Sequence, residues 1–420
     1  MADSQTVRSV DSASTSLVSD GRTHQKAFYP PQQWPLMIRL VQSVSYPLAQ
    51  VLYKFRLSSI SEVQVGRVRA VDNARLVFIC NHPTMEDGIS LFVLSARLGQ
   101  LFHYIVAHES FQGLMGWFIQ RLGCYSIRRG MGDRASISET LTLLKQSLCR
   151  IVIFPEGGCS YQNDTVMPFR PGAIQLPMSA LAQQAKKAAS LEDVSDLYVV
   201  PLSLKYRYLS PVHRVIEATL SRLEAELMIS ASSKDPYHRL RQVAHRVILA
   251  IENEAHLPHD QSLDWNQRIH RLRQVFIQKC EAALDLAPNL NVPIRERVYR
   301  VQSMLEEAEI SDDRSKALYW DTVRLLNFDA IYDGYVAESP TQERFLDTLM
   351  RLEREVFHLE HAQPKAPRKA CFYIGEPINL KDYLADYQRD RTGTIEQLAE
   401  QLRNIVQTNL DAMNRDAHML

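Results

Sequence analysis

The feature that most constrains the fold is a series of short apolar runs of strand length, separated by stretches with helical spacing. The runs are RLVFIC at 75–80, CYSI at 124–127, IVIF at 151–154 and VVPLSLKY at 199–206. Uninterrupted apolar runs of this length are typical of strands that are buried on both faces. Because strands that alternate with helices form mostly parallel sheets, we expect an α/β core, a mixed sheet flanked by helices, over residues 63–210.

The pattern changes after Pro211. Six helical segments follow between 212 and about 362, with almost no strand signal, and prolines mark most of the breaks. A strand signal returns in KACFYIGEPINL at 369–380, and a helical pattern follows at 395–413. We therefore predict a large all-helical insertion at 211–367 before the last core strand, and a return to the core at 368–420.

Polar residues follow the first apolar run at the point where its strand should end. Asn81 and His82 come directly after the run, Pro83 cannot continue a central strand, and a helical pattern begins at Asp87. Ligand sites of parallel α/β sheets lie at this carboxyl edge. Histidine can accept a proton near neutral pH, and a carboxylate on its other ring nitrogen would orient it. We therefore predict that His82 and Asp87 form a catalytic general-base pair.

Three later segments also combine an apolar run with arginines, glycines or a proline. Arg128 and Arg129 come after CYSI, and a guanidinium matches phosphate oxygens bidentately, although a surface position or a salt bridge is the plain alternative. The run at 151–154 continues into the segment FPEGG at 154–158, where glycines let the backbone approach a ligand closely. Pro201 within the last run indicates an edge strand or a bulge.

Taken in order, NHPTMED at 81–87, GCYSIRR at 123–129, FPEGG at 154–158 and VVP at 199–201 resemble the four sequence blocks of the glycerolipid acyltransferase family. The resemblance covers roughly 63–210 and 368–415. It implies transfer of a fatty acyl group from acyl-CoA or acyl carrier protein, as a co-substrate without any other cofactor, to a lipid hydroxyl in phospholipid biosynthesis. The acceptor would be a lysophospholipid, most simply 1-acyl-sn-glycerol-3-phosphate.

The resemblance also implies roles for individual residues. Arg129 would bind phosphate, and Glu156 would bind the acceptor or order the arginines. Cys159 stands where the family often has an arginine, and Arg170 in MPFRPGA could substitute for it. The substrate-binding residues implied in this way are Asn81, Arg128, Arg129, Glu156, Gly157, Gly158 and Arg170, beside the catalytic His82 and Asp87.

Composition excludes several other classes of function. Lys plus Arg and Asp plus Glu both number 48, so no global charge signal points to a nucleic-acid partner. The six cysteines form no CxxC pair, which argues against a thiol metal site and favours a reduced, cytoplasmic setting. We interpret His256 with His259, and His358 with His361, as solvated pairs rather than metal ligands. A second His-x4-Asp pair, His259 and Asp264, follows no strand and is interpreted as coincidental.

The N-terminal region predicts a peripheral membrane contact. Residues 1–30 begin with a Ser-, Asp- and Thr-rich stretch and are interpreted as a disordered tail. Residues 31–62 carry an amphipathic pattern, with Leu36, Leu40 and Val44 on one helical face, and Pro47 should kink or split this helix. No apolar run is long enough to span a bilayer. We expect a monotopic helix on the cytoplasmic face of a membrane, or else an ordinary helix packed on the core.

Three alternative functions stay open at this point. Glycerol-3-phosphate itself is a second possible acceptor, which the IRR sequence and the paired glycines favour slightly. A non-catalytic lipid-binding or scaffold protein on the same fold would fit Cys159 and the large helical insertion. A thioester or ester hydrolase would need a nucleophile, and no GxSxG elbow occurs in the chain.

Overall fold

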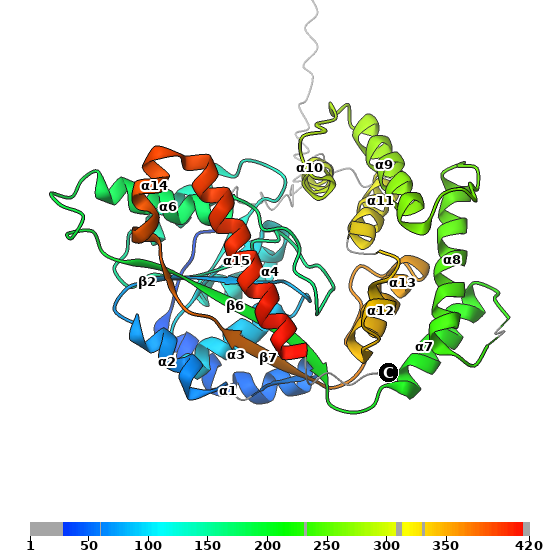
Figure 1. Cartoon of the computed structure of the whole chain (residues 1–420), viewed down its shortest axis with the longest axis horizontal. Coiled ribbons are helices and arrows are strands. Elements are labelled where there is room, and N and C mark those ends of the chain that lie inside the picture. Colours follow the sequence, from blue (N-terminus) through cyan, green and yellow to red (C-terminus); the bar gives the residue numbers. More distant parts are fainter. Residues whose placement is uncertain (1–27, 59, 231–232, 308–312, 330–331, 415–420) are drawn as a thin grey trace, which may run out of the picture.

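The core of the structure is one mixed, mostly parallel sheet (Figure 1). The computed structural model describes residues 28–58, 60–230, 233–307, 313–329 and 332–414, so the tail expected at 1–30 lies almost wholly outside the described residues. The strands run in the order β1-β7-β6-β2-β5-β3-β4, with β8 paired to β6. Their bounds are β1 Phe55–Leu57, β2 Arg75–Cys80, β3 His103–Ala107, β4 Cys124–Ile127, β5 Arg150–Ile153, β6 Leu197–Tyr208, β7 Arg368–Ile374 and β8 Ile378–Asn379.

Five of these strands form the parallel block in which the sequence motifs lie. Strands β6, β2, β5, β3 and β4 are parallel neighbours, whereas β7 is antiparallel to β6 and β1 is parallel to β7. All six residues of β2 are buried, as its continuous apolar run predicts. The α/β class, the mixed sheet and the return to the core after the helical stretch are therefore confirmed.

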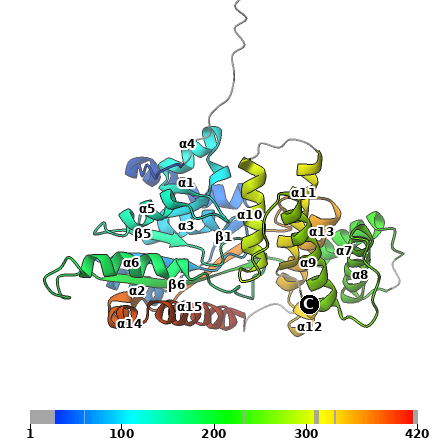
Figure 2. The same ribbon diagram turned by 90° about the horizontal axis from the view of Figure 1, so that it is seen from above.

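Helices cover both faces of the sheet (Figure 2). Side chains alternate along a strand, so Leu76, Phe78 and Cys80 face one helical layer and Val77 and Ile79 face the other. The first layer contains α1 Pro35–Leu52, α2 Glu62–Ala70, α3 Asp87–Leu98, η1 His108–Phe111 and α4 Gly113–Arg121. The second contains α5 Arg134–Leu143, α6 Gly172–Ala185, η2 Leu380–Tyr383, α14 Leu384–Arg389 and α15 Arg391–Asn414.

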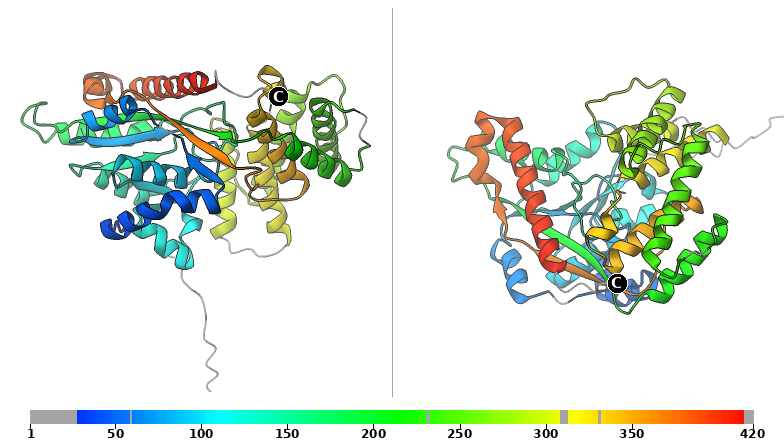
Figure 3. Two further views of the ribbon diagram at one scale, coloured as in Figure 1. Left: turned by 90° about the horizontal axis from the view of Figure 1, so that it is seen from below. Right: turned by 45° about the vertical axis from the view of Figure 1, so that its right-hand side comes forward.

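The helical stretch between β6 and β7 has a hydrophobic core of its own. It packs beside the carboxyl edge of the parallel strands, so the insertion stands next to the motif loops (Figures 1 and 3). Its helices are α7 His213–Glu226, α8 Pro236–Glu254, α9 Trp265–Ala283, α10 Ile294–Glu307, α11 Asp313–Asp329, α12 Tyr335–Glu338 and α13 Gln342–Val356.

Three details differ from the expectations. Pro201 does not mark an edge, because β6 lies in the middle of the sheet between β2 and β7. The missing N–H is tolerated there because β8 pairs only as far as Val199 and the β7 pairing begins at Leu202. Pro47 does not split the N-terminal helix, since α1 continues through it. The region 31–62 also contains β1, which pairs with β7 and was not expected.

Among the described helices, none combines the length and the apolar character that a membrane crossing requires.

Candidate active site

The His82 and Asp87 side chains meet at the carboxyl edge of the parallel strands. His82 lies two residues after β2 and Asp87 is the first residue of α3. The imidazole Nδ1 lies 2.7 Å from Asp87 Oδ2. Asp87 is fully buried, while the His82 side chain is 18% exposed. Because Nδ1 donates to the carboxylate, Nε2 is the ring nitrogen that can accept a proton.

Two further residues hold the Asp87 carboxylate in place. Oδ2 also accepts a hydrogen bond from the backbone N–H of Thr84 at 3.0 Å. Oδ1 accepts from the Thr84 hydroxyl at 2.8 Å and from the Tyr206 hydroxyl at 2.9 Å. The Tyr206 hydroxyl lies 2.6 Å from Ser90 Oγ, so the network reaches from α3 to β6. With every acceptor position used, the buried carboxylate is compensated and its orientation is fixed.

The His82 ring and backbone are positioned by the loop that follows β5. Phe154 stacks on the imidazole, with the two ring centroids 4.2 Å apart. Glu156 Oε1 accepts the His82 backbone N–H at 2.8 Å, and Ser160 N–H donates to the His82 carbonyl at 2.8 Å. The loops that carry the first and third motifs are therefore locked together on both sides of His82.

The Glu156 and Asn81 side chains form hydrogen bonds with backbone groups. Glu156 is buried, and its Oε2 accepts the Met167 N–H at 3.3 Å. Burial raises the pKa of the Glu156 carboxyl to about 7, although the His82 N–H bond and the charge of Arg295 oppose this shift. The Asn81 amide donates to the Leu204 carbonyl at 2.9 Å and accepts the Leu204 N–H at 2.7 Å, so it ties β2 to β6.

The predicted arginines gather around one tyrosine of the insertion, Tyr299 of α10. The Arg129 guanidinium lies over the Tyr299 ring at 4.7 Å and that of Arg170 at 5.6 Å. Arg129 also pairs with Glu109. Arg128 follows the end of β4 with its backbone N–H bonded to Asp133 at 2.9 Å. The structure thus brings Arg129 and Arg170 together at the edge where His82 lies.

The paired glycines of the third motif are needed for close approach. Gly157 has a φ of 73°, and a Cβ there would collide with the Arg170 guanidinium. A Cβ at Gly158 would collide with the Tyr299 hydroxyl. Gly130, with a φ of 75°, lies directly against the α10 backbone at Tyr299. Helix α10 therefore rests on both glycine loops, and the insertion forms one wall of the site.

The competing features found in the sequence have structural explanations. The Asp264 carboxylate accepts the Gln267 N–H and caps α9, while His259 lies beside Glu252, so this second His–Asp pair is not joined. No cluster of three or more potential metal ligands occurs within the ranges that the structure describes.

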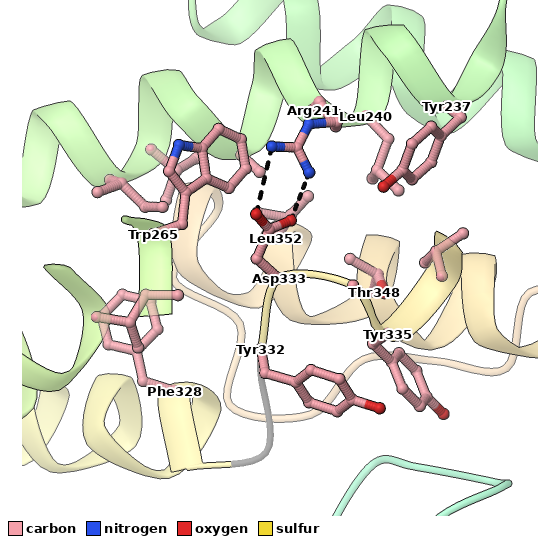
Figure 4. A pocket seen from close by; sticks show the side chains of 16 residues that line it. Tyr237, Leu240, Arg241, Trp265, Phe328, Tyr332, Asp333, Tyr335, Thr348 and Leu352 are labelled. Atoms are coloured by element: carbon pink, nitrogen blue, oxygen red, sulfur yellow. Dashed lines mark hydrogen bonds and ion pairs between the residues drawn. The ribbon is translucent and has the colours of Figure 1, made fainter. Parts of the chain in front are cut away.

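An apolar cavity lies elsewhere, inside the insertion (Figure 4). Its volume is about 70 Å³, and all its lining residues fall between Tyr237 and Leu352. Arg241 and Asp333 form an ion pair at its wall. Since no residue of the four motifs lines this cavity, it is separate from the His82 site.

Thr84, Tyr206, Arg295 and Tyr299 join the site although the motif pattern did not single them out. Thr84 could have been found, because a threonine three residues before a helix-starting aspartate is a local hydrogen-bonding pattern. Tyr206 bonds a residue 119 positions away, and Arg295 bonds one 137 positions away. No local signal reports such pairings.

Fold and site together define an α/β domain with a hydrogen-bonded His–Asp pair at the carboxyl edge of its parallel strands. Residues 62–205 match the family model described as Acyltransferase. This stretch is a domain of the glycerolipid acyltransferase family, and the protein is an acyltransferase that uses an acyl donor and a lipid acceptor. No curated protein matches the chain.

Proposed function

We propose that this protein transfers a fatty acyl group from acyl-CoA or acyl carrier protein to the hydroxyl of a lysophospholipid, most simply 1-acyl-sn-glycerol-3-phosphate. The observation that carries the proposal is the His82–Asp87 pair, with its 2.7 Å contact and a buried, fully bonded carboxylate. This geometry leaves one imidazole nitrogen free to act as a base towards an incoming hydroxyl.

The proposed reaction needs no covalent enzyme intermediate. His82 Nε2 takes the proton of the acceptor hydroxyl while its oxygen forms a bond with the thioester carbonyl carbon. Asp87 stabilises the imidazolium that results. The carbon–sulfur bond then breaks, and the imidazolium returns the proton to the leaving thiolate. An ester and a free thiol are the products.

Different residues support the binding of substrate and the placement of the base. Arg129 and Arg170 are suited to an acceptor phosphate because their guanidinium groups converge beside Tyr299. Arg128 is adjacent and can contribute to the same charge. Glu156 and Asn81 act on the acceptor site indirectly in this proposal, since their bonds to backbone groups fix His82 and β6. Gly157 and Gly158 give the arginines and α10 room to approach.

A membrane surface is the proposed location of the acceptor. The α1 residues Leu36, Leu40 and Val51 are 88%, 69% and 76% exposed, and Leu114 at the start of α4 is 87% exposed. The two helices are neighbours, because Trp34 contacts Trp117 edge to face at 6.3 Å (Figure 2).

The chemistry of this face suits a bilayer interface. Arg121 stacks on the ring of Trp34 at 4.7 Å and on that of Trp117 at 3.9 Å. Exposed aliphatic side chains beside tryptophan and arginine are typical of helices that lie in the headgroup region. Seven Lys or Arg and one acid occur between Arg22 and Ala70, which favours an anionic surface. We infer a peripheral association through α1 and α4.

The proposal is tested by thiol release from acyl-CoA and acyl carrier protein donors of several chain lengths. Lysophosphatidate, glycerol-3-phosphate and water serve as separate acceptors. We expect release that depends on lysophosphatidate and falls by at least about 10³-fold in His82→Ala. His259→Ala is the matched control, because His259 belongs to the unjoined His–Asp pair, and it should retain activity.

Each other outcome contradicts part of the proposal. Release with glycerol-3-phosphate but not with lysophosphatidate would assign the other acceptor. Release into water alone would indicate a hydrolase. Failure to release thiol with any donor would refute catalysis and favour a lipid-binding or scaffold role.

A further inference from the structure

Arg295 of the insertion reaches into the third motif. It is the second residue of α10, and its side chain is only 7% exposed. Nη1 donates to the Gly158 carbonyl at 3.1 Å, and Nε donates to Asp329 Oδ2 at 2.6 Å. Nη2 is buried and has no hydrogen-bond partner within the described part of the chain. An unpaired donor on a buried cation is costly, so a missing anionic partner is a physical explanation for it.

Arg170 presents the same pattern from the other side of the same loop. Its Nε pairs with Glu296 at 2.9 Å, and its Nη2 is also buried without a partner among the described residues. Its guanidinium lies against Gly157, next to the glycine whose carbonyl Arg295 bonds. Two unpaired guanidinium donors therefore flank adjacent residues of the FPEGG loop.

The electrostatics agree with this convergence. Burial lowers the pKa of Arg170, and the positive charges of Arg295 and Arg129 add to that effect. Each of the three arginines already has an acidic partner. Arg170 pairs with Glu296, Arg295 with Asp329, and Arg129 with Glu109. Those pairs use one edge of Arg170 and of Arg295 and leave the Nη2 of each for a ligand.

We propose that Arg295 binds the phosphate of the acyl acceptor together with Arg170, so that the helical insertion completes the acceptor site. This inference rests on the proposed acyltransferase reaction. It also gives the departure at Cys159 a physical account, because a guanidinium from α10 supplies the charge that this position of the third motif lacks. Arg295 is thus a specificity-determining residue for a phosphate-bearing acceptor.

The test compares Arg295→Met and Arg295→Lys with Arg273→Met in the full chain. Arg273 of α9 and Arg295 both pair with Asp329, so either methionine variant removes one of its two ion pairs and leaves the other. Neither change leaves the partly buried Asp329 carboxylate without a cationic partner. Arg273 therefore controls for loss of charge and for stability, while it bonds no residue of the third motif among the interactions described.

Steady-state rates are measured by varying lysophosphatidate at fixed acyl-CoA, and then acyl-CoA at fixed lysophosphatidate. Because Arg295→Met loses one charged hydrogen bond to the acceptor, its acceptor KM should rise by about 10- to 100-fold, with little change in kcat or the donor KM. Arg295→Lys should lie between Arg295→Met and the natural protein. Arg273→Met should keep the natural acceptor KM.

An unchanged acceptor KM in both Arg295 variants would overturn the inference. A rise confined to the donor KM would also overturn it, because it would assign Arg295 to a phosphate of the donor. Calorimetric binding of glycerol-3-phosphate to the natural protein and to Arg295→Lys gives a readout without turnover. Equal affinities would refute the role of Arg295. Absence of thiol release from the natural protein, with binding that depends on Arg295, would instead refute only the reaction.

Discussion

Asp87→Asn separates the charge of the carboxylate from its orienting role. An asparagine amide can place its oxygen or its nitrogen towards His82. If the nitrogen took the Oδ2 position, it would face the backbone N–H of Thr84, a fixed donor that lies 3.0 Å from Oδ2. That buried N–H would then be unpaired, at a cost of about 1–3 kcal/mol. The Oδ1 position is different, because it faces only the hydroxyls of Thr84 and Tyr206, which can rotate and accept.

The amide oxygen should therefore keep its place against Nδ1, and the imidazole should keep its tautomer. What the variant loses is the negative charge beside the imidazolium. A hydrogen bond to a charged partner is worth about 1.5–3 kcal/mol, so we expect kcat to fall by about 10- to 150-fold. Asp87→Ala removes the acceptor for His82, Thr84 and Tyr206 together, and should lower kcat on the order of 10³–10⁴-fold.

The assay is lysophosphatidate-dependent thiol release at saturating substrates, with Asp264→Asn as the matched control at the helix cap. A loss on the order of 10⁴-fold in Asp87→Asn, equal to that of Asp87→Ala, would mean that the amide turns and inverts the tautomer, and the reasoning from Thr84 would be wrong. A loss smaller than about threefold would show that the charge of Asp87 has no part in the reaction.

Three further predictions concern the walls of the site and the membrane face. Burial raises the pKa of the Glu156 carboxyl to about 7, so this group makes the natural fold lose stability as pH rises from about 4.5 to 7. Glu156→Gln removes this titration, and the Tm of the variant should therefore fall less across that pH range. Gly158→Ala should destabilise the fold by about 1–3 kcal/mol through collision with Tyr299, and Tyr299→Phe in the same chain should recover part of it, as measured by urea unfolding. Leu36→Glu should weaken binding to anionic vesicles, measured by sedimentation, about tenfold or more, whereas Leu290→Glu, on a similarly exposed leucine of the insertion, should not.

A different result would contradict each of these three predictions. A pH dependence of Tm identical to that of the natural protein would assign the titration to another carboxyl. Additive losses in the Gly158 and Tyr299 double variant would mean that the two residues do not touch. Equal vesicle binding by Leu36→Glu and Leu290→Glu would argue that α1 packs against protein rather than lipid.

The sequence predicted those parts of the structure that depend on local pattern. The run RLVFIC became β2 because burial on both faces requires a continuous apolar strand, and Asp87 begins α3 within the same short segment. The longer helices of the insertion were also predicted, because each repeats its apolar residues at helical spacing, whereas the short α12 was not expected. The same reasoning from local sequence wrongly favoured an edge strand at Pro201, because whether a strand lies at an edge depends on which distant segments pair with it.

Side-chain partners were accessible only where they lie close in sequence. The His82–Asp87 pair spans five positions, and its contact follows from a strand end facing a helix start. Glu156 was expected at the acceptor, but its burial and its bond to the His82 N–H come from the packing of two loops 74 residues apart. Charge and exposure at such a position are properties of the assembled fold, so residue type alone could not separate a ligand contact from a positioning bond.

The insertion shows why the proposed contribution of Arg295 to the site could not be predicted from the sequence. Its helices carry many arginines, and most of those with described ion pairs serve the insertion itself, as Arg239 does with Glu224 and Arg297 with Glu281. Arg295 belongs to the same helix as Arg297 and differs from it only in the direction in which it points. Two residues along a helix is a rotation of about 200°, which turns one arginine to the core of the insertion and the other to the FPEGG loop. An anion site built in this way requires α10 to sit on Gly130 and Gly158, so acceptor affinity and the docking of the insertion should change together.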